Sequence, residues 1–146
     1  LGVGKTQWGK GSKLLAVADG PGLPLSVSPT SARPHEVTLV ETTLEACFAP
    51  DLPRRVIGDR AYDSDQLDRR LAERGVETHP PRRHRRRPKT QEGRKRRRDK
   101  RRWKVERLFA GLGNFRRLVV RYERHVENFL GFVQLGCIII LLRHLL

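Results

Sequence analysis

A turn signal near the amino end is the feature that most constrains the fold. Asp19-Gly20-Pro21-Gly22 separates two short apolar runs, residues 13–18 (KLLAVA) and 23–28 (LPLSVS). Glycine, proline and aspartate between two strand-like runs are typical of a turn that reverses the chain. The sequence therefore predicts a β-hairpin that begins with residue 13 and ends near residue 28.

Helical and strand-like patterns then alternate along the chain. Pro34 opens a stretch with helical spacing of apolar residues, which predicts a helix with one buried stripe: Val37, Val40, Leu44, Cys47 and Phe48. The run from Arg55 to Asp59 (RVIGD) predicts a strand that ends at Asp59. Ser64 is placed to cap a second helix that Gly75 ends, and residues 76–79 predict a short strand.

The carboxyl-terminal third is predicted to be helical. Residues 94–112 carry a stripe of Trp103, Glu106, Phe109 and Leu112, which predicts that Glu106 lies on a packed face. Residues 127–144 predict a final helix with the largest apolar surface of the chain. Its charge-free stretch of about 15 residues is shorter than the ~20 needed to cross a bilayer, which favours a buried helix over a membrane span. The alternation predicts an α/β fold in one domain, residues 1–146.

Positive charge is concentrated in one segment. The chain has 31 Lys and Arg against 16 Asp and Glu, a formal charge of +15, which indicates a polyanionic partner. Residues 82–102 hold 14 of these basic residues against two acids, and residues 80–102 predict a basic loop followed by the start of a helix. A solvated charged face is the simpler interpretation, but such dense charge repels itself unless phosphates are near, which favours contact with DNA.

Two acidic residues in different settings suggest chemistry. Asp59 closes a strand-like run, and Glu106 lies in the helical string RRWKVERLFAGL. Carboxylates from a strand end and from a later helix can share a magnesium ion, which prefers oxygen ligands. This pattern predicts cutting or joining of a polynucleotide backbone. The simpler alternatives are a loop-capping role for Asp59 and a helix salt bridge between Glu106 and Arg102.

Three strings together carry a resemblance to a known family: GDRAYDSD (58–65), RWKVERLFAGLGNFRRLVVRYE (102–123) and HVENFLGFVQLGCIIILL (125–142). With them in this order, the chain resembles DDE transposases of bacterial insertion sequences, in the group with a Tyr-x2-Arg-x3-Glu signature. The resemblance implies a ribonuclease H-like fold, a mixed sheet with flanking helices. It also implies metal-dependent phosphodiester hydrolysis and strand transfer at insertion-sequence ends, with Mg²⁺ or Mn²⁺ as cofactor.

The resemblance assigns residues by position. Asp59 matches the second and Glu106 the third acidic residue of the family's triad, both as metal ligands, and Arg102 matches the signature arginine. The sequence departs from the pattern at Asp99, where a tyrosine is expected, and at Gly113, where a lysine is expected. DNA contacts are expected from the basic run and from a later arginine pair: Arg94, Lys95, Arg96, Arg97, Arg98, Lys100, Arg101, Arg116 and Arg117.

The first acidic residue of the triad has no match in the sequence. The family places it on a central first strand, upstream of the string KGSK (10–13), and the sequence begins just short of that point. We therefore expect an amino-terminally truncated domain that lacks its central strand and is inactive alone. The implied partners are transposon-end and target DNA and a second copy in a DNA complex, with no membrane.

The two cysteines lack the spacing of a disulfide or zinc site, which favours reduced thiols and a cytoplasmic protein. The expected DNA contacts make this protein nucleoid-associated. Two other functions remain open. One is a basic nucleic-acid-binding protein without chemistry. The other is a metal-dependent nuclease of the same fold that never joins strands.

Overall fold

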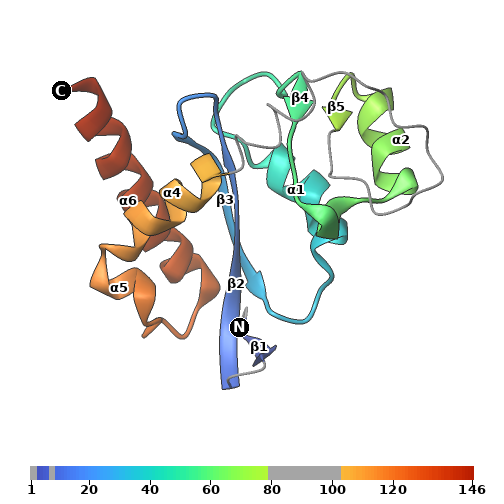
Figure 1. Ribbon diagram of the computed structural model, residues 1–146. Helices are drawn as coiled ribbons and strands as arrows, with labels where there is room; N and C mark the ends of the chain where they lie inside the picture. The colour runs from blue at the N-terminus through green and yellow to red at the C-terminus, as the bar shows by residue number, and fades with distance from the viewer. Residues whose placement is uncertain (1–2, 7–8, 79–102) are drawn as a thin grey trace.

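A long antiparallel hairpin forms the centre of the molecule. The computed structural model describes residues 3–6, 9–78 and 103–146. Strands β2 (Gly9–Ala18) and β3 (Pro24–Ser31) pair in antiparallel register, and the short β1 (Gly4–Thr6) pairs with the start of β2. In Figure 1 this hairpin runs through the middle, with helices on both sides. The predicted hairpin is confirmed, and β1 is an addition that the sequence pattern does not predict.

The hairpin turn owes its shape to Asp19. One carboxylate oxygen of Asp19 accepts hydrogen bonds from the backbone N–H groups of Gly22, at 2.8 Å, and Leu23, at 2.7 Å. Gly22 has a φ of 99°, a conformation that only glycine adopts readily. Asp19 therefore serves the turn, and its carboxylate is committed there.

On one side of the hairpin, short helices cover a small parallel sheet. The elements in chain order are η1 (Glu36–Leu39), α1 (Val40–Glu45), β4 (Arg55–Val56), η2 (Arg60–Tyr62), α2 (Asp65–Glu73) and β5 (Glu77–Thr78). Strands β4 and β5 pair in parallel. The predicted cap is confirmed: the Ser64 hydroxyl accepts a hydrogen bond from the N–H of Leu67, at 3.4 Å, and Gly75 follows the helix with a φ of 76°.

On the other side, three helices pack together: α4 (Trp103–Gly113), α5 (Arg116–Val119) and α6 (Val126–Leu145). The first turn of α4 lies against the hairpin turn, because a Cβ on Gly22 would be only 3.5 Å from the Cβ of Lys104. The predicted final helix is confirmed. The predicted helix starting at residue 94 is confirmed from Trp103 onward, and residues 94–102 lie outside the described part of the chain.

The two sides have separate cores, joined by the hairpin. The helical core consists of Val27, Leu108, Leu112, Phe129, Val133 and Cys137, and the mixed core of Leu44, Leu67, Leu71 and Val76. Leu14, Ala16 and Ala18 of β2 pack against the helical core, whereas Val17 packs against the mixed core. Since side chains alternate between the faces of a strand, β2 serves both cores at once.

Two predictions of buried residues are wrong. Phe48 is 50% exposed, because the helix ends at Glu45 and does not extend its stripe that far. In α4 the buried residues are Leu108 and Leu112, whereas Trp103 and Glu106 are exposed. A spacing of three residues falls about 60° short of a full turn, so Trp103 and Leu112, nine residues apart, lie on opposite faces of the helix.

Helix α6 is only partly the buried helix that was predicted. It is 20 residues long and passes the length and composition test for a membrane span. One face packs into the helical core through Phe129, Val133 and Cys137, while several large apolar side chains of the other face are exposed: Leu135, Ile138, Leu142 and Leu145. The prediction therefore holds for one face of the helix.

The architecture as a whole is a mixed α/β arrangement of small sheets and helices, as the sequence predicts. The sheet is not continuous in the described residues: the three antiparallel strands and the parallel pair β4–β5 share no hydrogen-bonded edge.

Candidate functional site

Asp59 lies in a tight turn just after β4. The strand ends at Val56, three residues earlier than predicted, and η2 begins at Arg60. One carboxylate oxygen of Asp59 accepts a hydrogen bond from the N–H of Ala61, at 2.6 Å, and its backbone carbonyl accepts one from the N–H of Tyr62, at 3.1 Å. The loop-capping alternative is therefore correct for one oxygen. The residue is exposed, so its carboxylate also faces solvent.

Tyr62 fastens this turn to the rest of the molecule, although the sequence alone does not single it out. Its half-buried hydroxyl interacts with the Glu36 carboxylate, which pairs with the Lys13 ammonium at 3.2 Å. A Cβ on Gly58 would come within 3.0 Å of the Tyr62 ring, so the ring and the backbone before Asp59 are in close contact. The only sequence signal for this role is the place of Tyr62 in the string GDRAYDSD.

The electrostatics of Tyr62 reflect the same contacts. Burial raises the pKa of its phenol to about 12, and the negative charges of Glu36 and Asp59, together with hydrogen bonding to Glu36, add to this increase. The neutral phenol is thus strongly favoured at physiological pH. A chain of contacts from β2 through η1 to η2 therefore holds the turn that presents Asp59.

Glu106 lies on the first described turn of α4 and is exposed. The prediction of a packed face for this residue is wrong, because the packed stripe of α4 runs through Leu108 and Leu112. An acid in the first turn of a helix is favoured by the helix dipole. The predicted partner Arg102 lies outside the described residues.

The two acids come from opposite sides of the hairpin, Asp59 from the side of the mixed core and Glu106 from the helical side (Figure 1). Within residues 3–6, 9–78 and 103–146, no three Asp, Glu, His or Cys side chains are grouped closely enough to hold a metal ion. Two exposed carboxylates suit Mg²⁺ in donor chemistry, but a complete site needs more ligands than these two. Asp59 and Glu106 are therefore the type of ligand that a magnesium site needs, but the described residues supply too few of them.

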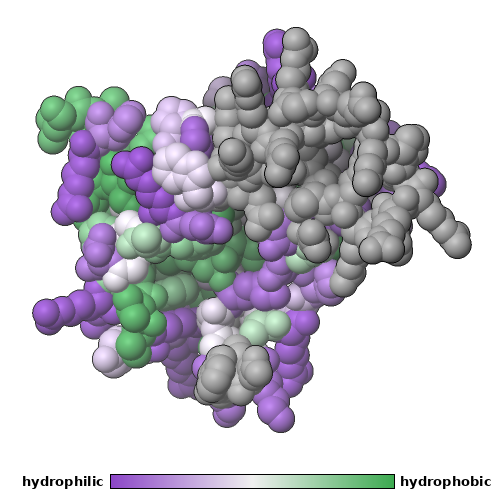
Figure 2. Space-filling model, viewed as in Figure 1, coloured by the Kyte–Doolittle hydropathy of each residue, from purple (hydrophilic) through white to green (hydrophobic). Residues whose placement is uncertain are grey.

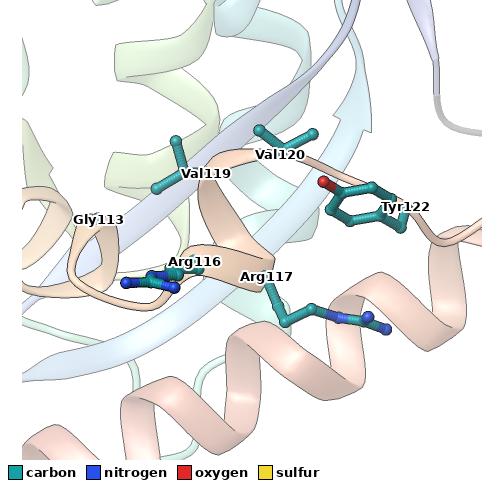
Figure 3. Close-up of a pocket in the computed structure, with 6 residues that line it drawn as sticks. All are labelled: Gly113, Arg116, Arg117, Val119, Val120 and Tyr122. Atoms are coloured by element: carbon teal, nitrogen blue, oxygen red, sulfur yellow. The ribbon is translucent and has the colours of Figure 1, made fainter.

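The arginine pair of α5 borders an open hollow of about 570 Å³ lined by Gly113, Arg116, Arg117, Val119, Val120 and Tyr122 (Figure 3). Arg117 forms an ion pair with Glu123 at 2.9 Å. Arg116 is exposed and forms no ion pair within the part of the chain that the structure describes. The other predicted DNA contacts, Arg94, Lys95, Arg96, Arg97, Arg98, Lys100 and Arg101, lie outside the described residues.

Both cysteines are free, as predicted. Burial raises the pKa of the Cys137 thiol to about 11 and also raises the pKa of Cys47. Burial thus disfavours the thiolate, which is the nucleophilic form, at both cysteines.

Comparison with known proteins agrees with the chemistry that Asp59 and Glu106 predict. Residues 2–142 match a family model described as "Transposase DDE domain". The chain is 36% identical over 138 residues to a protein of Burkholderia cepacia named as a transposase for insertion sequence element IS402, covering 89% of this chain and 62% of that protein. It is 32% identical over 137 residues to a protein of Brucella ovis named as a transposase for insertion sequence element IS6501, covering 90% of this chain and 98% of that protein. No solved structure matches the chain.

Proposed function

Because the chain belongs to the transposase DDE domain family, we propose that it acts as the catalytic domain of an insertion-sequence transposase, hydrolysing and transferring DNA phosphodiesters at the ends of the element. The observation that carries this proposal is a family match spanning residues 2–142, which includes both Asp59 and Glu106. The chain spans 62% of the length of its IS402 relative, so the activity of the whole protein is part of the proposal.

The proposed cofactor is Mg²⁺ or Mn²⁺, with one carboxylate ligand from Asp59 and one from Glu106. Such an ion polarises a phosphodiester and lowers the pKa of an attacking water. The contribution of this chain is to hold Asp59 in a fixed turn through Tyr62 and to present Glu106 on an exposed helix turn. Two carboxylates leave such a metal site short of ligands, which is why we propose that the chain alone has little activity.

The proposed substrate is DNA, at transposon ends and at the target, with a homodimer as the assembly on that DNA and the cytoplasmic nucleoid as its location. Support comes from the net charge of +15 and from the exposed Arg116 beside an open hollow. Arg102 and the basic run between Arg94 and Arg101 complete the proposed contacts. Neutralising phosphates in this way makes binding strongly salt-dependent.

We also propose that the fold is ribonuclease H-like with an incomplete sheet. Support comes from the hairpin β2–β3 and the parallel pair β4–β5, which lie in separate small sheets within the described residues. A central strand between them would join the two into one mixed sheet.

A metal titration tests the catalytic proposal against the alternative of a basic nucleic-acid-binding protein without chemistry. Binding of Mn²⁺ is measured by the loss of its free electron-spin-resonance signal, for the wild-type chain and for Asp59→Asn and Glu106→Gln. We expect each substitution to weaken Mn²⁺ binding by at least the ~10-fold that loss of an outer-shell partner costs. Asp51→Asn and Glu73→Gln, which change exposed acids elsewhere, serve as matched controls and should leave binding unchanged.

Equal Mn²⁺ affinity in all five proteins would contradict a metal site shared by Asp59 and Glu106. The alternative of a nucleic-acid-binding protein without chemistry would then remain. A strand-cleavage assay on transposon-end DNA with Mg²⁺ or Mn²⁺ then tests the proposed inactivity of the chain alone. Metal-dependent nicking that is lost in Asp59→Asn would show that the chain is active by itself, contrary to that part of the proposal.

A further inference from the structure

The exposed Tyr122 lies at one end of a stack of three side chains, with Arg117 in the middle and Phe132 at the other end. The guanidinium carbon of Arg117 lies 5.6 Å from the centroid of the Tyr122 ring and 5.1 Å from that of Phe132. These distances are those of cation–π contacts. Tyr122 is nevertheless 71% exposed, so Arg117 covers one part of the ring and the remainder faces solvent.

The stack is held in place before any ligand arrives. Arg117 is fixed by the Glu123 carboxylate at 2.9 Å, and the Glu123 side chain is only 6% exposed. Phe132 belongs to α6, which is anchored in the helical core. A planar surface whose supports are already ordered loses little conformational entropy when a ligand stacks on it.

The hollow beside the stack combines three features that suit a nucleotide. Arg116 supplies a positive charge that is not paired within the described residues, Val119 and Val120 supply apolar surface, and Tyr122 supplies an aromatic face (Figure 3). Proteins that bind unpaired nucleic acid combine positive charge along the backbone with aromatic rings on which bases stack. We propose that this hollow binds an unpaired nucleotide of DNA, with the base on Tyr122 and its phosphate near Arg116.

A second copy of the chain is the other candidate occupant, since tyrosine and arginine are also enriched in protein interfaces. Residues 113–124 carry four arginines against one glutamate. In a two-fold interface the same patch meets itself, so these positive charges would face each other. The positive charge of residues 113–124 therefore favours a polyanion over a second copy of the chain as the occupant of the hollow. This inference rests on the proposed action on DNA and adds to it a site for a base outside the duplex.

The test separates the contribution of the base from that of the phosphates. Fluorescence anisotropy gives the affinity of the chain for a 12-nucleotide oligothymidine, for an abasic strand of the same length and for a blunt duplex, at one fixed salt concentration. We expect the wild-type chain to bind oligothymidine about tenfold more tightly than the abasic strand, as stacking on one aromatic ring predicts. Tyr122→Ala should remove most of this preference while leaving duplex binding unchanged.

Two further variants control for folding and for nonspecific effects. Tyr122→Phe keeps the ring and should keep the preference, and Phe48→Ala removes a similarly exposed aromatic residue on the other side of the molecule and should also keep it. Equal preference in wild type and Tyr122→Ala, with normal duplex binding, would overturn the nucleotide site alone. Failure of the wild-type chain to bind any of the three DNAs would overturn the proposed function together with this site. A wild-type dimer in sedimentation velocity that Tyr122→Ala dissociates would assign the surface to a second copy and also overturn the proposal.

Discussion

The two sides of the central hairpin differ in how completely they bury their apolar residues. On the side of the mixed core, α1 and α2 close over Leu44, Leu67 and Leu71, and Phe48 is the large apolar side chain left exposed among the described residues. On the helical side, α4, α5 and α6 pack around a core of six buried residues, against four in the mixed core, but leave many large apolar residues in solvent. Figure 2 shows this apolar surface, in green, on the side where these helices lie.

Under the proposed function, the two sides would divide stability and DNA recognition between them. The contacts of Tyr62 and the hydrogen bond from the N–H of Ala61 hold the turn that carries Asp59. The helical side presents Glu106, the arginines of α5 and Tyr122 on exposed surfaces, where they can reach a ligand. Substitutions on the two sides should therefore differ in how much they change the free energy of unfolding.

The largest effect is expected for Leu71→Ala in the mixed core. Leu71 is fully buried, at 0% exposure, and its truncation leaves a cavity that α2 cannot close without losing its other contacts. We expect a loss of about 3 kcal/mol in the free energy of unfolding, measured by urea denaturation. A loss below about 1 kcal/mol would indicate that this side is loosely packed and would remove the contrast between the two sides.

An intermediate effect is expected for Tyr62→Phe. The substitution removes the interaction of the phenol with Glu36 and should cost about 1 kcal/mol at neutral pH. The pKa of Tyr62 is about 12 in the folded protein and ~10 in an unfolded chain. The stabilisation is therefore complete below pH 10 and is lost as the pH rises toward 12.

The difference in unfolding free energy between wild type and Tyr62→Phe should accordingly narrow between pH 10 and pH 12. Tyr122→Phe removes a hydroxyl from an exposed ring on the helical side and serves as the matched control, with no such difference at any pH. A gap for Tyr62→Phe that stays constant over this range would argue against the raised pKa of Tyr62, and so against its burial beside Glu36.

The smallest effect is expected for Leu135→Ala on α6. Leu135 is 55% exposed, so its truncation opens no cavity, and we expect a change within about 0.5 kcal/mol by the same denaturation experiment. A destabilisation comparable to that of Leu71→Ala would mean that this face of α6 is covered in solution.

Local chemistry made much of the fold predictable from sequence. Asp19 and the glycines after it specify the hairpin turn, and Ser64 and Gly75 specify the two ends of α2, because each effect depends on residues only a few positions apart. The alternation of strands and helices followed from the same local patterns. Three longer strings carry the resemblance to the transposase family, and the family match over residues 2–142 confirms it.

Features that depend on tertiary contacts could not be predicted in this way. The predicted stripe through Glu106 is wrong because a three-residue spacing drifts around a helix. The packing of α4 against β2 and α6 decides which of its faces is buried. The predicted strand before Asp59 is too long, because the capping of η2 by the Asp59 carboxylate competes with strand pairing. Tyr62 contacts Glu36 of η1, and Arg117 lies against both Tyr122 and Phe132 of α6; no local sequence pattern indicates these contacts. The roles of Asp59, Glu106 and Arg102 in catalysis stay predictions.

Because β2 packs against both cores, insertions and deletions within this strand should be poorly tolerated. Deleting or inserting a single residue within this strand would turn Leu14, Ala16 and Ala18 away from the helices and send Val17 toward them, so both halves of the molecule would lose their fit at once. Extra residues at Gly20 would keep this alternation but would separate the Asp19 carboxylate from the N–H groups of Gly22 and Leu23. Variation in length among viable descendants should therefore spare the stem of the hairpin.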